Sequence, residues 1–189
     1  MPRPIQATLD IPALRHNLSQ IKFAAPDALV WAVVKANAYG HGIERIFEGL
    51  RAADGIALLD LSEAERVRQL GWRGPILLLE GAFETRDLEM CSRLNLWHVV
   101  HSEAQIDMLA VHKTHQPHRV FLKMNTGMNR FGLPWREVAT WSRELAALRG
   151  LEFAGVLHTP GTAPVLQHRD RMPGAVWFED TQLNFAENL

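Results

Sequence analysis

The chain has 189 residues, of which 47% are hydrophobic and 22% charged, and its formal net charge is −1 at pH 7. This balance is that of a soluble globular domain, and the near-zero charge gives no bulk electrostatic case for binding nucleic acid or an anionic membrane. The apolar runs are strand-sized, shorter than the roughly 20 residues of a membrane span, and the N-terminus lacks the apolar stretch of a secretory signal. A single cysteine, Cys91, excludes an internal disulfide framework and fits a reducing cytoplasm.

Short apolar runs alternate with helix-length amphipathic segments through most of the chain. The runs are nearly continuous rather than alternating in polarity, as expected for parallel strands that are buried on both faces. Strands are predicted at residues 30–34, 55–59, 75–79, 96–100, 119–122 and 153–157.

The segments between the predicted strands carry helix-start signals. Ser62–Glu65 and Ser102–Gln105 fit capping boxes, and Pro134 suits the first turn of a helix that runs to about Leu148. Strand and helix repeat at roughly every 20–25 residues, which indicates an α/β fold made of βαβ units. Near-equal unit lengths, and no glycine-rich phosphate loop after the first strand, favour a (β/α)8 TIM-type barrel over a doubly wound sheet.

About six predicted strands are two fewer than a closed barrel needs. Residues 1–158 are therefore predicted to form an incomplete barrel. The breaker cluster Thr159–Pro164 and the polar residues after it predict that 159–189 is an irregular tail.

Lys35 closes the first apolar run, within Val33-Val-Lys-Ala-Asn-Ala-Tyr-Gly-His-Gly42. The C-terminal ends of parallel strands face the functional site, and apolar neighbours favour the neutral form of a lysine, so Lys35 is a candidate Schiff-base amine. Gly40 and Gly42 allow tight turns after it. A strand-end lysine can equally extend its amine into solvent and have no function, and position alone leaves both interpretations open.

A second block, Leu122-Lys-Met-Asn-Thr-Gly-Met-Asn-Arg-Phe-Gly132, follows the predicted strand 119–122. It is predicted to be a strand end that runs into a turn and delivers Arg130 to the same rim as Lys35. The planar guanidinium group of arginine binds both oxygens of a carboxylate at once, so Arg130 is a candidate reader of a substrate carboxylate. The alternative is a solvated surface arginine, which is the usual fate of this residue type.

These two blocks resemble motifs of alanine racemases, the first nearly residue for residue. The resemblance implies that Lys35 binds the cofactor pyridoxal 5′-phosphate covalently and acts as one of two catalytic bases. It implies that Tyr39 hydrogen-bonds the cofactor phosphate, and that Arg130 contacts the substrate carboxylate and the phenolic oxygen of the cofactor. Lys123 matches a lysine that supports the arginine and is carbamylated in some members. His158 is a weaker match to a histidine near the cofactor ring, because the residues around it depart from the family's His-Phe-Ala.

The resemblance covers about residues 2–150 and implies the interconversion of L-alanine and D-alanine in the cytoplasm by a homodimer. In that family the second base is a tyrosine from the partner's C-terminal domain. Because no matching segment follows here, we expect a truncated and inactive form. Residues 169–189 resemble an N-terminal segment of acetoacetyl-CoA synthetases, which suggests a fusion. The alternatives are a non-catalytic single-barrel protein that binds pyridoxal phosphate, and an inert fusion fragment.

Five histidines raise the question of a metal site. His112, His115 and His118 follow one another at three-residue spacing, with His98 and His101 nearby. Short spacings are typical of zinc ligands, but no carboxylate or cysteine completes a site, and histidines near a helix C-terminus are also stabilised by its dipole. The sequence therefore predicts no metal.

Overall fold

The computed structural model describes residues 5–113 and 116–159, together with the backbone of residues 177–179. The chain divides into two compact units, Met1–Leu79 and Glu80–Leu189, called here the N-terminal unit and the C-terminal unit. Most of the predicted tail, residues 160–176 and 180–189, lies outside the described residues.

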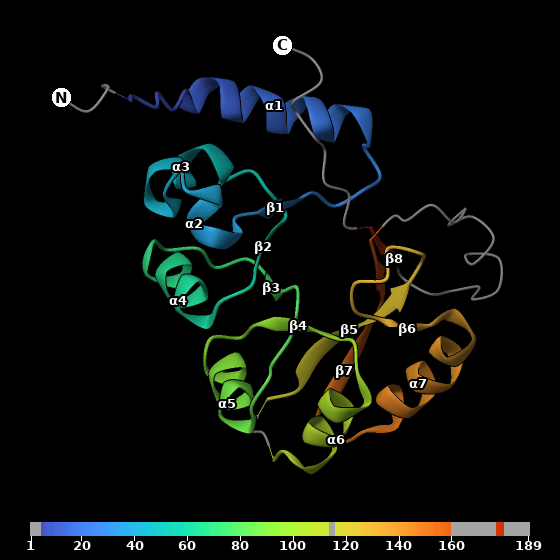
Figure 1. The fold of residues 1–189 in the computed structure, drawn as a ribbon. Helices are drawn as coiled ribbons and strands as arrows, with labels where there is room; N and C mark the ends of the chain where they lie inside the picture. Colours follow the sequence, from blue (N-terminus) through green and yellow to red (C-terminus); the bar gives the residue numbers. More distant parts are fainter. Residues whose placement is uncertain (1–4, 114–115, 160–176, 180–189) are drawn as a thin grey trace. The chain divides into compact units, whose positions relative to one another are not determined.

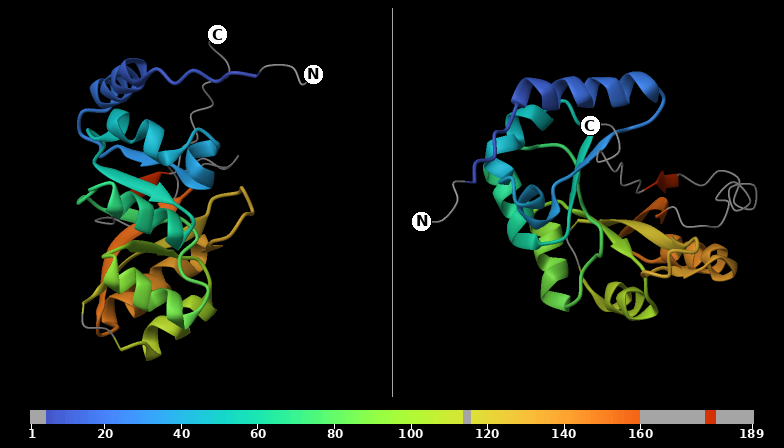
Figure 2. Two further views of the ribbon diagram at one scale, coloured as in Figure 1. Left: turned by 90° about the vertical axis from the view of Figure 1, so that its left-hand side faces the viewer. Right: turned by 45° about the horizontal axis from the view of Figure 1, so that its top comes forward.

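The N-terminal unit consists of parallel strands covered by helices. In chain order its elements are α1 (Ile11–Ala24), β1 (Trp31–Val33), α2 (Lys35–Tyr39), α3 (Ile43–Leu50), β2 (Gly55–Leu58), α4 (Leu61–Gln69) and β3 (Ile76–Leu78). Strand β2 pairs in parallel with β1 on one side and β3 on the other. Figures 1 and 2 show α3 and α4 on the same side of these strands.

Two helices of this unit, α1 and α4, have an aspartate as the N-cap residue, and at α4 it stands in place of the predicted serine. The amide of Ala13 donates to Asp10 Oδ1 at 2.9 Å at the start of α1, and that of Ser62 donates to Asp60 Oδ1 at 2.7 Å at the start of α4. The capping box predicted at Ser62 is therefore wrong, because Asp60 has the extended backbone of a cap and an anionic acceptor that the positive end of the helix attracts.

The C-terminal unit repeats the strand–helix alternation. Its elements are α5 (Thr85–Arg93), β4 (Trp97–Val100), α6 (Glu103–Val111), β5 (His118–Asn125), β6 (Leu133–Pro134), α7 (Trp135–Ala147), β7 (Leu151–His158) and β8 (Trp177–Glu179). Its strands pair in parallel: β4 with β5, β5 with β6 and β7, and β7 with β8. Each of the six predicted strands is present in the two units, with boundaries that differ by up to three residues.

Helix starts in this unit differ in detail from the predictions. Ser102 is the N-cap of α6, but the predicted box is not formed, because the Gln105 side chain accepts from the amide of His101 instead of that of Ser102. The helix predicted from Pro134 begins at Trp135, with Pro134 as its N-cap residue.

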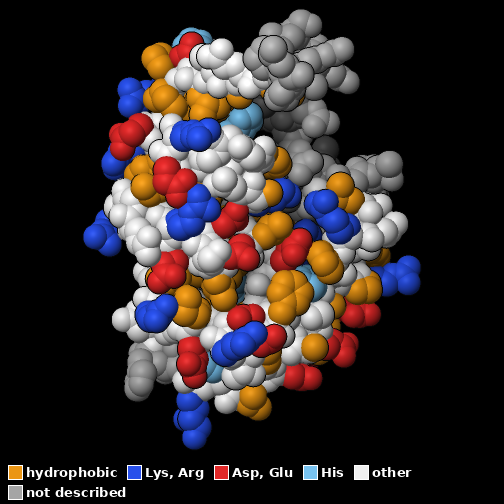
Figure 3. All heavy atoms as spheres, turned by 60° about the vertical axis from the view of Figure 1, so that its left-hand side comes forward, with side chains coloured by type: hydrophobic (Ala, Val, Ile, Leu, Met, Phe, Trp, Pro, Cys, Tyr) orange, Lys and Arg blue, Asp and Glu red, His pale blue; other side chains and the backbone are white. Residues whose placement is uncertain are grey.

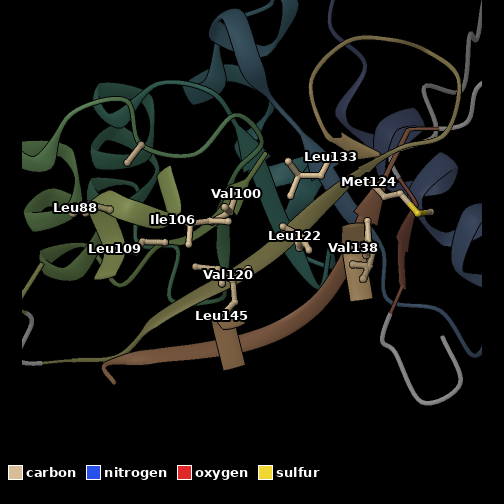
Figure 4. Packing of buried hydrophobic residues seen from close by; sticks show 12 residues of the cluster. Leu88, Val100, Ile106, Leu109, Val120, Leu122, Met124, Leu133, Val138 and Leu145 are labelled. Carbon is tan, nitrogen blue, oxygen red and sulfur yellow. The ribbon is translucent and has the colours of Figure 1, made fainter. Parts of the chain in front are cut away.

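The core of the C-terminal unit lies between its strands and helices. Side chains of β4, β5, α6 and α7 meet there, as Figure 4 shows, and Val100, Val120, Leu122, Val138 and Leu145 are each fully buried. Burying each such side chain stabilises the fold by about 1.5–3 kcal/mol.

The single cysteine is also buried. Cys91 of α5 has no exposed surface. Burial, helped by the negative charge of Asp87, raises the pKa of its thiol to about 12. The thiol is therefore protonated and shielded at neutral pH.

The surface mixes charges of both signs. Lysine and arginine side chains lie among aspartate and glutamate side chains over the face in Figure 3. Among the described residues, no helix combines the length and apolarity needed to cross a membrane.

Candidate active site

Lys35 follows β1 directly and begins an unusual turn. Residues 36–39 have φ angles of 52°, 54°, 55° and 55°, so α2 is one turn of left-handed helix made without glycine. The amide of Ala38 donates to the carbonyl of Val34 at 2.7 Å, and that of Gly40 donates to the carbonyl of Ala36 at 2.9 Å. Each residue in this conformation costs roughly 1–2 kcal/mol, so the turn needs support from outside.

That support comes from α3 and α4. The amide of Asn37, in the middle of the turn, donates to Glu63 Oε1 at 2.5 Å. The Asn37 side-chain oxygen accepts from Arg66 Nη2 at 2.8 Å and from the amide of Ile43 at 3.2 Å. Arg66 in turn forms an ion pair with Glu44 at 2.7 Å. Glu63 and Arg66 were missed at the level of sequence, because the segment after Asp60 was interpreted only as a helix start.

Lys35 and Tyr39 are the first and last residues of the left-handed turn. Lys35 is half-buried and follows the fully buried Val34, whereas the Tyr39 side chain is 54% exposed. Beside them, a Cβ atom added to Gly40 would meet no atom within 4 Å. An amine and a phenolic hydroxyl at the two ends of one turn, with open space next to them, fit the attachment and phosphate groups of pyridoxal phosphate.

Replacing Ala36 by glycine tests the strain in this turn. Ala36 is exposed and has a φ of 52°, so Ala36→Gly loses no packing and removes the left-handed cost. After the larger folding entropy of glycine is subtracted, we expect the free energy of unfolding to rise by about 0.5–1 kcal/mol. Urea denaturation measures it. Ala139→Gly, at an exposed position inside the right-handed helix α7, should instead lose about 1 kcal/mol. Losses in both variants would show that the turn is not strained.

In the C-terminal unit, Arg130 lies on an exposed turn after β5. Asn125, the last residue of β5, accepts on its side-chain oxygen from the amides of Gly127 at 3.0 Å and Asn129 at 3.2 Å. Its Nδ2 donates to Asn129 Oδ1 at 3.0 Å. Asn129 and Phe131 on either side of Arg130 both have a φ of 56°. The side chain of Asn125 thus folds the turn, and the turn presents Arg130 to solvent.

Lys123 and His158 are buried in the neighbouring strands β5 and β7, with exposures of 5% and 2%. His158 is in register with Met124, the residue after Lys123. The register depends on a bulge at Ala154, because Val120 pairs with Phe153 and Phe121 with Gly155. Lys123 itself pairs with Leu157, so His158 lies one position further along β7. Because successive strand residues face opposite sides of a sheet, the structure does not bring these two predicted supporting side chains onto one face.

His101, after β4, contacts the same turn. Its ring stacks on Phe131 with 4.4 Å between the ring centroids. The pKa of His101 is lowered, first by burial and further by the positive charge of Lys123, while a hydrogen bond to the Glu80 backbone opposes the shift. Gln105 holds this region by donating to the carbonyls of Glu80 at 2.9 Å and Ala82 at 3.0 Å. From sequence, His101 was considered only as a metal ligand, and this packing role was missed.

The other histidines lie toward the start of the strands. The rings of His98 and His118 have centroids 5.2 Å apart, and those of His112 and His118 are also 5.2 Å apart. His115 lies outside the described residues. Within the described part of the chain, no three metal-ligating side chains are placed to hold an ion.

The sequence and the fold match known proteins. The family model described as alanine racemase, N-terminal domain, matches residues 9–183. The chain belongs to this family. It is 74% identical over 144 residues to the alanine racemase of Paracidovorax citrulli, covering 76% of this chain and 39% of the relative. It is 74% identical over 159 residues to that of Albidiferax ferrireducens, covering 84% of this chain and 42% of the relative.

Solved structures of alanine racemases share the fold. The biosynthetic alanine racemase from Pseudomonas aeruginosa matches with a TM-score of 0.80 at 33% identity, over 89% of this chain and 49% of that one. The alanine racemase from Acinetobacter baumannii also gives a TM-score of 0.80, at 25% identity over 90% of this chain and 55% of that one. These matches confirm the predicted fold class, an α/β incomplete (β/α)8 barrel, and the predicted family. This alanine racemase family chain spans about two fifths of the curated relatives' length, 39% and 42%. The likeness of residues 169–189 to acetoacetyl-CoA synthetases stays a prediction.

Proposed function

We propose that this chain is the cofactor-binding part of an alanine racemase that interconverts L-alanine and D-alanine with pyridoxal 5′-phosphate. The observation that carries the proposal is Lys35 at the strand end, joined to Tyr39 by a strained left-handed turn that neighbouring helices hold in place. Backbone strain of this kind persists where the surrounding structure enforces it, and it concentrates at functional sites.

Each candidate residue has a distinct task in this proposal. The Lys35 amine holds the cofactor and moves a proton at Cα on one face of alanine. The Tyr39 hydroxyl donates to the cofactor phosphate. Arg130 binds the substrate carboxylate with its planar guanidinium, and the buried Lys123 and His158 support the strand ends beside it. When bound, the cofactor supplies an electron sink that makes the Cα proton of alanine acidic.

Membership of the family also suggests an oligomeric state and a cellular location. We propose that the complete enzyme is a homodimer that works in the cytoplasm, where a lone, buried cysteine such as Cys91 stays reduced. Carbamylation of Lys123 belongs to the same proposal, since this residue matches the family position in which some members carry that group.

Borohydride trapping tests the assignment of Lys35. Purified chain is incubated with pyridoxal phosphate and reduced, and the labelled peptide is identified by mass spectrometry. We expect the label on Lys35 and its loss in Lys35→Ala. Lys22→Ala is the matched control, because Lys22 is occupied by an ion pair with Asp54 at 2.8 Å, and it should label as the wild type does. A label mainly on another lysine would refute the assignment.

A further inference from the structure

Helix α4 directs two charged side chains toward the left-handed turn. Glu63 is 8% exposed, and its Oε1 accepts from the amide of Asn37. Its other oxygen, Oε2, is buried and has no hydrogen-bond partner among the described residues. Burying a carboxylate is costly, and an exposed position on α4 would avoid that cost. The burial of Glu63 therefore calls for a compensating role.

Accepting a hydrogen bond from the amide of Asn37 is that role. The first amides of a helical turn lack carbonyl partners within the turn, and an ordinary helix satisfies them with the side chain of its N-cap residue. In the turn at 36–39, the accepting oxygen comes from a different helix, 26 residues further along the chain. Glu63 thus caps the left-handed turn from outside.

Arg66 holds the same residue through its side chain. It lies one helical turn after Glu63 on α4, and its Nη2 donates to the Asn37 side-chain oxygen at 2.8 Å. The ion pair with Glu44 of α3 fixes the guanidinium group in place. Asn37 is therefore tied to α4 by its backbone and by its side chain, and this residue lies midway between Lys35 and Tyr39.

We propose that Glu63, assisted by Arg66, is a positioning residue that keeps residues 36–39 left-handed and so sets the directions in which Lys35 and Tyr39 leave the turn. The identity of the group that these two residues bind rests on the proposed function. The capping itself does not, because it depends only on contacts within the N-terminal unit.

Hydrogen exchange of the whole chain without cofactor tests the capping. In Glu63→Ala, amides of residues 35–40 should exchange at least about tenfold faster relative to those of β2, the effect of losing one hydrogen bond to a charged group. Glu63→Gln keeps an accepting oxygen and should stay within about threefold of the wild type. Gln69→Ala, at an exposed position of α4, is the matched control and should change nothing. Adding Ala36→Gly to Glu63→Ala should restore slow exchange, because glycine adopts the left-handed conformation without support.

Borohydride labelling of the same variants with pyridoxal phosphate links the cap to the lysine. The label on Lys35 should fall about tenfold in Glu63→Ala and recover with Ala36→Gly, in parallel with the exchange. If Glu63 only filled space in the core, Ala36→Gly at its exposed position would not restore the labelling of Lys35.

Three outcomes would overturn the proposal. These are unchanged exchange and labelling in Glu63→Ala, no rescue by Ala36→Gly, and an equal defect in Glu63→Gln. If Glu63→Ala also loses protection in β2, Arg66→Ala decides instead, because this half-exposed side chain contributes little to the core and should show the same local effect. Absence of any label on wild-type Lys35 would refute the proposed function, while the exchange data would still decide on Glu63.

Discussion

Lowering the pH from about 6.5 to about 4.5 is expected to reduce the free energy of unfolding by about 5 kcal/mol, through two buried histidines. Burial, reinforced by the charge of His118, lowers the pKa of His98 from 6.5 to about 3. Burial, reinforced by the charge of His112, lowers that of His118 from 6.5 to about 4. The two side chains are 1% and 3% exposed, so little solvent screens them.

The direction follows from proton binding. In the unfolded chain both imidazoles take up a proton as the pH falls through 6.5, whereas in the folded chain they stay neutral until about pH 4 for His118 and about pH 3 for His98. Between these values the unfolded state binds more protons, so stability decreases with decreasing pH. Each histidine contributes about 1.4 kcal/mol per pH unit in this window, and the loss is complete below its folded pKa.

Urea denaturation at half-unit steps between pH 7.5 and 4.5 measures this dependence. His118→Gln and His98→Gln should each flatten the slope by about 1.4 kcal/mol per pH unit, whatever their stability at neutral pH. His16→Gln, at an exposed position of α1, should leave the slope as it is in the wild type. Equal slopes in all four proteins would show that carboxylates, and not these histidines, govern acid unfolding.

These 189 residues alone are expected to racemise alanine about 10²–10⁴-fold more slowly than a full-length relative, even with pyridoxal phosphate bound. Racemisation removes a proton from one face of Cα and delivers one to the other. In the proposed function, Lys35 serves one face. The family's second base is a tyrosine from the partner's C-terminal domain, whereas the single tyrosine of this sequence, Tyr39, is assigned to the cofactor phosphate.

The rate of D-alanine formation from L-alanine, followed by circular dichroism with saturating pyridoxal phosphate, measures this loss. A full-length relative assayed in parallel sets the reference, and Lys35→Ala sets the background. We expect protein that is labelled at Lys35 but nearly inactive. A non-catalytic protein that binds pyridoxal phosphate would give the same result. Turnover equal to that of the relative, abolished by Lys35→Ala, would show that a second base exists among these residues.

The strand pattern was predictable because burial on both faces leaves nearly continuous apolar runs. Runs of about five residues, such as 30–34 and 96–100, are typical of buried parallel strands, so the α/β barrel class followed from them and the matches confirm it. Boundaries were less predictable. Asp60 displaced the predicted cap at Ser62, because both residue types cap helices and only the backbone angles decide between them.

Residues of the candidate site were predictable only where they lie within a contiguous sequence motif. Lys35, Tyr39 and Arg130 lie in contiguous motifs, so they could be proposed as candidates before the fold was known, and their roles stay predictions. Glu63 was not predictable, because its partner amide is 26 residues away and a glutamate near a helix start is ordinarily solvated. The left-handed conformation of 36–39 was likewise hidden, since alanine and tyrosine rarely adopt it.

The rate at which alkylating reagents modify Cys91 can report local unfolding around α5. Alkylating reagents attack the thiolate, and the native thiol is fully buried with its pKa raised to about 12, so the folded protein should resist them. Modification then requires that α5 first leave its packed position, and the labelling rate measures how often this occurs. Because the sequence has one cysteine, every modified molecule records an event at one known place.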